Sequence, residues 1–249
     1  MFKEYGELST KLYEVTKSVG HSLNGDMEYY LEKVKNRQGS VLEAGVGTGR
    51  MLIPLLKEGI AIDGVDISPE MLTQCKTNMQ KYQVNTNLFN QDLIQLDLKQ
   101  KYSTIIMPSG SFCLLSRNQI DTFLQRIYHH LEEDGLFIFD TLLPIGFQTG
   151  DMEISNYPIT EDSGILFTSI SKGIDWLEQK ISYIHKYELL HKGAVKKTEI
   201  SHFILYWYGL KELEGLLKHI GFSSIDYDIG YGQENDPSLI TFSASKEHN

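Results

Sequence analysis

The 249-residue chain is long enough to bury the core of one α/β sheet domain without disulfide staples. Its two cysteines, Cys75 and Cys113, show no spacing typical of a disulfide framework or a zinc site, so we expect a reducing compartment and no metal centre. With 23 basic and 33 acidic residues, the formal charge of -10 excludes a broad electrostatic attraction to nucleic acid or anionic lipid.

We expect neither a secretory signal nor a membrane span in this sequence. The first five residues already include an acidic residue, and no apolar segment follows them. The longest apolar runs, 136–147 and 203–210, are short or interrupted by Asp140 and Pro144. We therefore expect a soluble cytoplasmic protein with no membrane partner.

Residues 40–140 alternate short strand patterns with helical patterns, which is typical of βαβ units around a parallel sheet. The predicted strands cover 40–44, 60–66, 87–90, 102–107 and 136–140. The predicted helices cover 49–58, 69–82 and 117–133. Ser68-Pro69 suits a helix start, and Ser116 fits a capping box before the third helix.

After Asp140 the apolar pattern changes to a period of two, which predicts an antiparallel ribbon with strands over 165–172, 176–191 and 195–208. A helix over 210–220 and strands over 223–229 and 238–245 close the chain. We interpret the whole chain, 1–249, as one domain with a helical cap over 1–39 and an inserted β lid over 141–209.

The most informative segment is the run from Val41 to Arg50, in which a buried strand leads into a Gly-x-Gly-x-Gly turn and then a helix. Gly45, Gly47 and Gly49 let the backbone turn sharply and approach a ligand closely, while helix N-terminal amides face that ligand. A dinucleotide-binding loop needs a small residue where this chain has Arg50, which argues against NAD or FAD.

Polar residues also follow the next strands of the predicted sheet. Asp66 ends the second strand, Asp92 follows the third, and Pro108 opens the segment after the fourth. Open α/β sheets bind their ligands at the carboxyl ends of the strands, so these residues and the glycine turn predict one site.

On these residues the sequence resembles the class I S-adenosylmethionine (SAM) dependent methyltransferases over nearly the whole chain. The resemblance rests on residues 43–49, 65–72, 91–93 and 131–140, and the chain's organisation is similar to sugar N-methyltransferases and glycine or sarcosine methyltransferases. It implies a Rossmann-like seven-stranded sheet, with the last strand antiparallel, flanked by helices and carrying an antiparallel β insertion after strand five.

The same resemblance implies SAM as the cofactor and gives roles to individual residues. The glycines pack against the methionine part, Asp66 holds the ribose hydroxyls, Ile67 and Met71 flank adenine, and Asp92 binds its amino group beside Leu93. A tyrosine of the N-terminal segment closes over the methionine end, with Tyr13 the best match and Tyr5 the second. The expected cofactor-binding set is Tyr13, Glu43, Gly45, Gly47, Gly49, Arg50, Asp66, Ile67, Met71, Asp92, Leu93 and Pro108.

The acceptor is less defined, because residues 108–115 contain no titratable side chain except Cys113. In the resembling enzymes the insertion after strand five covers the methyl donor, so we assign the acceptor to it. Alternation places Tyr183, His185 and Tyr187 on one face of a strand and His202 on a face of its partner. We expect His202, or else Asp140, to accept a proton.

The leading hypothesis is methyl transfer to nitrogen or oxygen of a small polar metabolite, possibly phosphate-bearing because Lys186, Lys192, Lys196 and Lys197 cluster within 185–202. The alternatives are a tRNA or protein methyltransferase and a non-catalytic SAM-binding regulatory module. An NAD-linked oxidoreductase is disfavoured by Arg50, and nucleic acid is not expected as a partner. The sequence leaves the oligomeric state open.

Overall fold

The computed structural model describes residues 5–233 and 236–247, and it divides them into two compact units. Residues 5–18 and 146–206 form the smaller unit, and the other described residues form the larger one. The expected cap over 1–39 is therefore shared: helix α1 (Glu7–Thr16) belongs to the smaller unit and helix α2 (Asp26–Val34) to the larger one. The first four residues of that cap lie outside the described residues.

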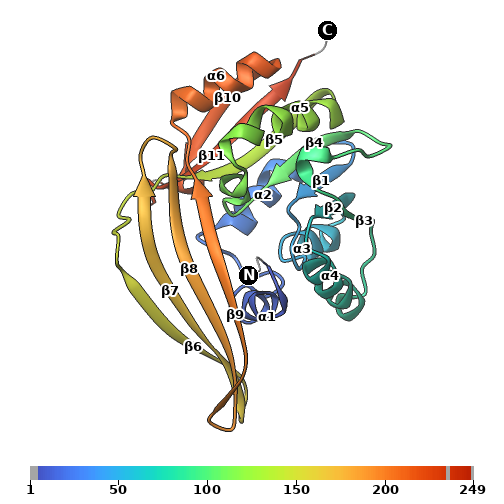
Figure 1. The fold of residues 1–249 in the computed structure, drawn as a ribbon. Helices are drawn as coiled ribbons and strands as arrows, with labels where there is room; N and C mark the ends of the chain where they lie inside the picture. Colours follow the sequence, from blue (N-terminus) through green and yellow to red (C-terminus); the bar gives the residue numbers. More distant parts are fainter. Residues whose placement is uncertain (1–4, 234–235, 248–249) are drawn as a thin grey trace. The chain divides into compact units, whose positions relative to one another are not determined.

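The larger unit contains a seven-stranded sheet in the order β10-β11-β5-β4-β1-β2-β3 (Figure 1). Strand β1 pairs in parallel with β2 and β4, and β4 pairs in parallel with β5, whereas β11 runs antiparallel to both β5 and β10. This confirms the predicted α/β, Rossmann-like sheet with its antiparallel last strand. The strands are β1 (Val41–Ala44), β2 (Ile62–Asp66), β3 (Leu88–Asn90), β4 (Tyr102–Met107), β5 (Leu131–Leu142), β10 (Phe222–Ile229) and β11 (Leu239–Lys246).

The remaining helices of this unit cover the sheet. Helices α3 and α4 contact β2, and α5 and α6 contact each other. The α-helices are α3 (Leu52–Lys57), α4 (Pro69–Tyr82), α5 (Ile120–His130) and α6 (Leu210–Ile220), and the short 3₁₀ turns are η1 (Leu93–Gln95), η2 (Ser111–Leu114), η3 (Arg117–Gln119) and η4 (Gly230–Gly232). All residues of β1 and β4 are buried, so the glycine turn follows a strand in the core of the sheet.

Local capping chemistry explains where α4 and α6 begin and end. The Ser68 hydroxyl accepts a hydrogen bond from the Met71 amide at 3.2 Å, and Pro69 occupies the first turn of α4. Gly221 ends α6 in the left-handed conformation, at a φ of 117°.

The prediction of one helix over 117–133 is wrong at both ends. Residues 117–119 form η3, and Leu131 already belongs to β5, where it pairs with Tyr102. The capping box at Ser116 is also wrong, because the Ser116 hydroxyl contacts the side chains of Asn118 and Gln119 and caps no backbone amide.

The smaller unit holds a four-stranded antiparallel sheet in the order β6-β7-β8-β9. Its strands are β6 (Met152–Thr160), β7 (Ser163–Asp175), β8 (Lys180–His191) and β9 (Ala194–Tyr206). The predicted ribbon is present, but β6 is an additional strand. The turn between the predicted strands 165–172 and 176–191 lies at residues 176–179, beyond the end of β7. Leu8 and Leu12 of α1 pack against Ile165 and Tyr187 of this sheet.

Among the residues that the structure describes, no helix combines the length and the apolar character that crossing a bilayer requires.

Candidate cofactor-binding site

The glycines after β1 have positive φ angles of 78° at Gly45, 55° at Gly47 and 84° at Gly49, and they serve different purposes. A Cβ at Gly49 would lie 2.8 Å from the Cys75 sulfur, so this glycine permits the close packing of the loop against α4. A Cβ at Gly47 would meet no atom within 4 Å. Gly47 therefore borders open space, as expected of a backbone that a ligand approaches.

Asp66, at the end of β2, supports this loop directly. One carboxylate oxygen accepts the Gly47 amide and the other accepts the Ser68 amide, each at 2.8 Å. Burial raises the pKa of Asp66, and these two backbone hydrogen bonds oppose that shift. The side chain thus joins the glycine turn to the start of α4, next to the open space at Gly47.

Replacing Asp66 with alanine should weaken the binding of S-adenosylhomocysteine by about 1.5–3 kcal/mol, the scale of losing hydrogen bonds to a charged group. The variant loses both the predicted ribose contact and the hydrogen bond that the Gly47 amide donates to Asp66. Titration calorimetry measures the affinity, and thermal unfolding of the same variant controls for its stability. A variant with unchanged affinity and reduced turnover would contradict the ribose assignment.

Glu43 presents an unusual buried carboxyl group within β1. Its side chain is 3% exposed, and its Oε2 atom has no hydrogen-bond partner among the described residues. Burial raises the pKa of Glu43 to about 8, although the nearby Arg50 opposes the shift. A buried acid with an unused oxygen is suited to a ligand that carries positive charge, and SAM does. Together with the open space at Gly47, it fits SAM.

Binding of SAM at pH 7 should release a proton from Glu43. The raised pKa keeps the carboxyl group mostly protonated in the free protein, and a bound cation lowers that pKa. The same shift stabilises the free fold most below about pH 4.5, and this contribution is lost as the pH rises through 8.

Calorimetric titrations in phosphate and in Tris, which differ in ionisation enthalpy, measure the proton release. The isosteric Glu43→Gln variant should show none at pH 7. Equal release from wild type and variant would assign the proton to another group.

The other predicted cofactor residues of the larger unit lie in the loops after β2, β3 and β4. Ile67 is 62% exposed directly after Asp66, whereas Met71 is buried in the first turn of α4. The Asp92 carboxylate accepts the Ile94 amide at 3.1 Å and caps η1, so one oxygen already serves a structural role. The adenine contacts of Ile67, Met71, Asp92 and Leu93 and the contact of Pro108 stay predictions.

Arg50 is buried and forms an ion pair with Asp26 of α2. Its guanidinium also donates to the His21 carbonyl at 2.7 Å and to the Ser109 hydroxyl at 2.6 Å. These contacts link the end of the glycine turn to the N-terminal segment and to the loop after β4. They give Arg50 a positioning role, while a direct contact with the cofactor stays a prediction.

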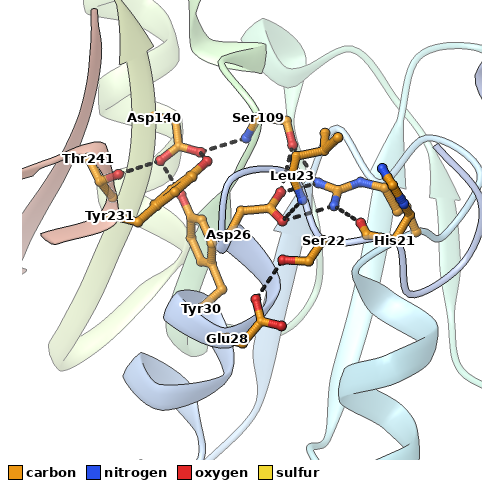
Figure 2. A network of polar contacts seen from close by, with 11 residues as sticks. His21, Ser22, Leu23, Asp26, Glu28, Tyr30, Ser109, Asp140, Tyr231 and Thr241 are labelled. Carbon is orange, nitrogen blue, oxygen red and sulfur yellow. Dashed lines mark hydrogen bonds and ion pairs between the residues drawn. The ribbon is translucent and has the colours of Figure 1, made fainter. Parts of the chain in front are cut away.

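A second network surrounds Asp140, whose side chain is fully buried near the end of β5 (Figure 2). One oxygen accepts the hydroxyls of Tyr30 at 2.8 Å and Thr241 at 2.7 Å, and the other accepts the Tyr231 hydroxyl at 2.7 Å and the Ser109 amide at 2.6 Å. Burial raises the pKa of Asp140 to about 6 against the effect of these donors. With both oxygens engaged, Asp140 is better placed to position the β4 loop than to accept a proton from an acceptor.

Ser109 connects the two networks, because its amide binds Asp140 and its hydroxyl contacts Arg50 and Asp26 (Figure 2). It has a φ of +60°, which is uncommon for a residue with a side chain. Sequence reasoning missed Ser109, Asp26, Tyr30 and Tyr231, because only the fold brings Asp26 to Arg50 and the other three to Asp140.

Tyr13 and His202 belong to the smaller unit. Tyr13 lies in α1 with the Lys17 ammonium over its ring, and His202 lies in β9 opposite Ile184 of β8. The closure by Tyr13 and the proton acceptance by His202 stay predictions.

Comparison with known proteins supports the resemblance. The family described as "Methyltransferase domain" matches residues 41–135, which hold the glycine turn, Asp66 and Asp92. A putative methyltransferase of Geobacillus sp. (strain WCH70) is 35% identical over 112 residues, which cover 43% of this chain and 45% of that protein. A carboxy-S-adenosyl-L-methionine synthase of Nautilia profundicola is 23% identical over 241 residues, 92% of each chain.

Solved structures share the fold. A sugar N-methyltransferase from Streptoalloteichus sp. superimposes with a TM-score of 0.80 at 16% identity, over 100% of this chain and 96% of that one. An amino pentose methyltransferase from Micromonospora echinaspora, solved with SAM bound, reaches 0.72 at 14% identity over 99% of both chains. Residues 41–135 therefore match the methyltransferase domain family, and the chain as a whole shares the fold of SAM-dependent methyltransferases of known structure.

Proposed function

We propose that this protein transfers a methyl group from SAM to a nitrogen or oxygen of a small polar metabolite in the cytoplasm. The observation that carries the proposal is the open backbone at Gly47 together with the buried Glu43, whose Oε2 atom has no hydrogen-bond partner among the described residues. In the same sheet, Asp66 ends β2 and Asp140 lies near the end of β5. When bound, SAM supplies an electrophilic methyl group.

The residues of this chain have to orient the cofactor and exclude water rather than form a covalent intermediate. The Asp26–Arg50 pair and Asp140 fix the loop after β4 through Ser109, and Asp66 fixes the glycine turn. Cys113 takes no part in this proposal, because burial raises the pKa of its thiol to about 11.

Incubation with methyl-labelled SAM and separate acceptor pools tests the proposal. The pools are amino sugars, glycine with sarcosine, bulk tRNA and denatured protein. Label in a small-molecule product supports the proposal, and label in tRNA or protein supports the macromolecular alternative. SAM binding without transfer to any pool would indicate a regulatory module.

A second candidate activity follows from the relative that is a carboxy-S-adenosyl-L-methionine synthase, since it aligns with 92% of both chains. Mass spectrometry of the cofactor after incubation with a cell extract distinguishes the two reactions. Conversion of SAM to S-adenosylhomocysteine fits methyl transfer, and a carboxylated SAM fits the synthase.

A phosphate group on the acceptor is a further part of the proposal, and its support is limited to the lysines of the β8–β9 hairpin. Lys186 pairs with Glu188 at 2.8 Å, Lys192 with Asp162 at 3.9 Å and Lys197 with Glu7 at 2.7 Å. Comparing nucleotide-linked and free amino sugars as acceptors tests this part.

A further inference from the structure

Tyr231 lies in a strained turn between the last two strands of the larger sheet. Its φ of 55° and ψ of 35° within η4 are left-handed, a conformation that is costly for a bulky side chain. Gly230 and Gly232 on either side also have positive φ angles, of 53° and 78°. A fold that keeps a large residue in such a conformation indicates that the side chain is needed in one particular place.

The strand order brings this turn to the edge of the sheet where the predicted cofactor residues lie. Strand β11 runs antiparallel to both β5 and β10, so β10 runs in the same direction as β5, β4 and β1. The connection from β10 to β11 therefore lies at the carboxyl ends of the parallel strands. The glycine turn and the loop after β4 lie at the same edge.

From this turn, the Tyr231 side chain reaches the buried carboxylate of Asp140 (Figure 2). Its hydroxyl donates to the Oδ2 atom at 2.7 Å, and the Ser109 amide donates to the same atom at 2.6 Å. The Oδ1 atom accepts the hydroxyls of Tyr30 and Thr241 instead. Ser109 is left-handed as well, with a φ of 60°. Two residues in an unfavourable backbone conformation thus share one oxygen atom, which joins the turn after β10 to the turn after β4.

The turn that begins at Ser109 touches the glycine turn at two points. The Ser109 hydroxyl accepts a hydrogen bond from the Arg50 guanidinium at 2.6 Å. The Ser111 side chain lies 3.5 Å from the place that a Cβ at Gly45 would take. A shift of Ser109 away from Asp140 would therefore move the residues that border the cofactor loop.

A neighbouring tyrosine shows what a structural ring does in the same cluster. The rings of Tyr29 and Tyr231 have centroids 5.2 Å apart. The Tyr29 hydroxyl, however, donates to Asp228 at 2.6 Å, and the Lys33 ammonium binds the same acid at 3.1 Å. Asp228 is partly exposed, whereas Asp140 is fully buried. Tyr29 therefore packs beside Tyr231 while its hydroxyl serves a different acid.

We propose that Tyr231 is a positioning residue for methyl transfer, which acts through Asp140 to hold Ser109 and the turn after it against the cofactor loop. The proposal rests on the proposed function and adds to it a residue from the connection between the last two strands. The Tyr231 hydroxyl fixes the direction of the oxygen that binds the Ser109 amide. As a donor, it also stabilises the charged form of Asp140.

The surroundings of Asp140 make its ionisation a useful readout. Burial raises its pKa to about 6, and the hydrogen bond from Tyr231 opposes that rise. The titratable side chains that interact with it have pKa values raised by burial and are uncharged at pH 7: Tyr29 and Tyr30 of α2, Cys113 of η2 and Tyr231 of η4. The charged Asp26–Arg50 pair acts on Tyr231 from the other side. Loss of the Tyr231 hydroxyl should therefore raise the pKa of Asp140 and leave more of this acid protonated near neutral pH.

The test compares Tyr231→Phe, which keeps the ring and removes the hydroxyl, with Tyr29→Phe, which makes the same change on the neighbouring ring. The acceptor is the pool to which wild type transfers label, among amino sugars, glycine with sarcosine, bulk tRNA and denatured protein. At pH 6.5 we expect the kcat of Tyr231→Phe to fall at least about tenfold, the scale of one lost hydrogen bond to a charged group.

The pH dependence and the KM separate positioning from stability. At pH 9, where Asp140 is ionised in both proteins, the deficit of Tyr231→Phe should shrink to less than about threefold. The KM for SAM should change less than about twofold, because Asp66 keeps its bond to the glycine turn. Tyr29→Phe should match wild type at both pH values.

The outcomes distinguish this proposal from the proposed function. An unchanged kcat in Tyr231→Phe, or a deficit of the same size at pH 6.5 and pH 9, would overturn the positioning role and leave the function standing. An equal loss in Tyr29→Phe would also overturn it, by tracing the effect to the packing of the rings. If wild type transfers methyl groups to none of the pools, the proposed function itself fails.

The amide signal of Ser109 supplies a readout that does not depend on turnover. In protein labelled with ¹⁵N-serine, this signal is the one absent from Ser109→Ala. Its proton shift should follow the ionisation of Asp140, because the amide donates to that carboxylate. In Tyr231→Phe the midpoint should rise by about one pH unit or more, and in Tyr29→Phe it should stay in place. An unchanged midpoint in Tyr231→Phe would overturn the proposal.

Discussion

A valine at position 47 should abolish the binding of SAM and S-adenosylhomocysteine, with a loss of affinity of at least about 100-fold, because the side chain would fill space that backbone now leaves to the ligand. The fold should remain, since a Cβ at Gly47 meets no protein atom within 4 Å. The left-handed φ of 55° adds a strain of about 1–2 kcal/mol for a branched residue. Calorimetric titration with both ligands measures the affinity.

The chain offers a matched control for this substitution. Gly59 has a φ of 82°, and a Cβ there also meets nothing within 4 Å, but it lies in the exposed turn between α3 and β2. Gly59→Val should therefore show a similar loss of stability with wild-type affinity. If both variants bound SAM equally well, the glycine turn would not be the cofactor loop.

Replacing Arg50 with methionine should lower the free energy of unfolding by about 3–5 kcal/mol, the usual cost of leaving one partner of a buried ion pair uncompensated. The Asp26 side chain is fully buried, and in this variant its carboxylate would keep, among the described residues, the Leu23 amide at 2.8 Å and the weaker Ser109 contact. Urea unfolding of the free protein measures the change.

The double variant Arg50→Met with Asp26→Leu is the decisive comparison. It removes both charges, so it should be more stable than Arg50→Met alone. Breaking the exposed Lys211–Glu214 pair by Lys211→Ala should leave the unfolding midpoint unchanged. An Arg50→Met variant as stable as Lys211→Ala would mean that the buried pair contributes nothing measurable to the fold.

The sequence predicts best those elements whose first and last residues are determined by residues adjacent in the chain. Helix α4 has the predicted bounds 69–82 because Ser68 and Pro69 define its start locally, and α6 ends where Gly221 follows it. Strand β6 was missed because it is an edge strand with mostly exposed residues, so neither alternation nor a buried run distinguishes it from a loop. Helix α5 ends three residues early because Leu131 pairs with Tyr102, a contact between distant segments.

The same distinction applies to the candidate site. The glycine turn and Asp66 were predicted because each is defined by a short motif at a strand end. The bonds from Tyr30 and Tyr231 to Asp140 join residues 110 and 91 positions apart, so no local pattern announces them. For the histidines, alternation identified rows on single strands, and the register of β8 against both neighbours shows that His185 and His202 lie on opposite faces of the sheet.

The composition of the smaller unit restricts how this protein can be re-engineered. Its sheet is completed by α1, whose Leu8 and Leu12 pack on Ile165 and Tyr187, while Glu7 binds Lys197. In a chimaera that receives only residues 146–206 from a relative, the relative's sheet would therefore have to pack against this protein's own α1. Exchanging this unit between relatives therefore requires two separate pieces of gene, one for residues 5–18 and one for residues 146–206.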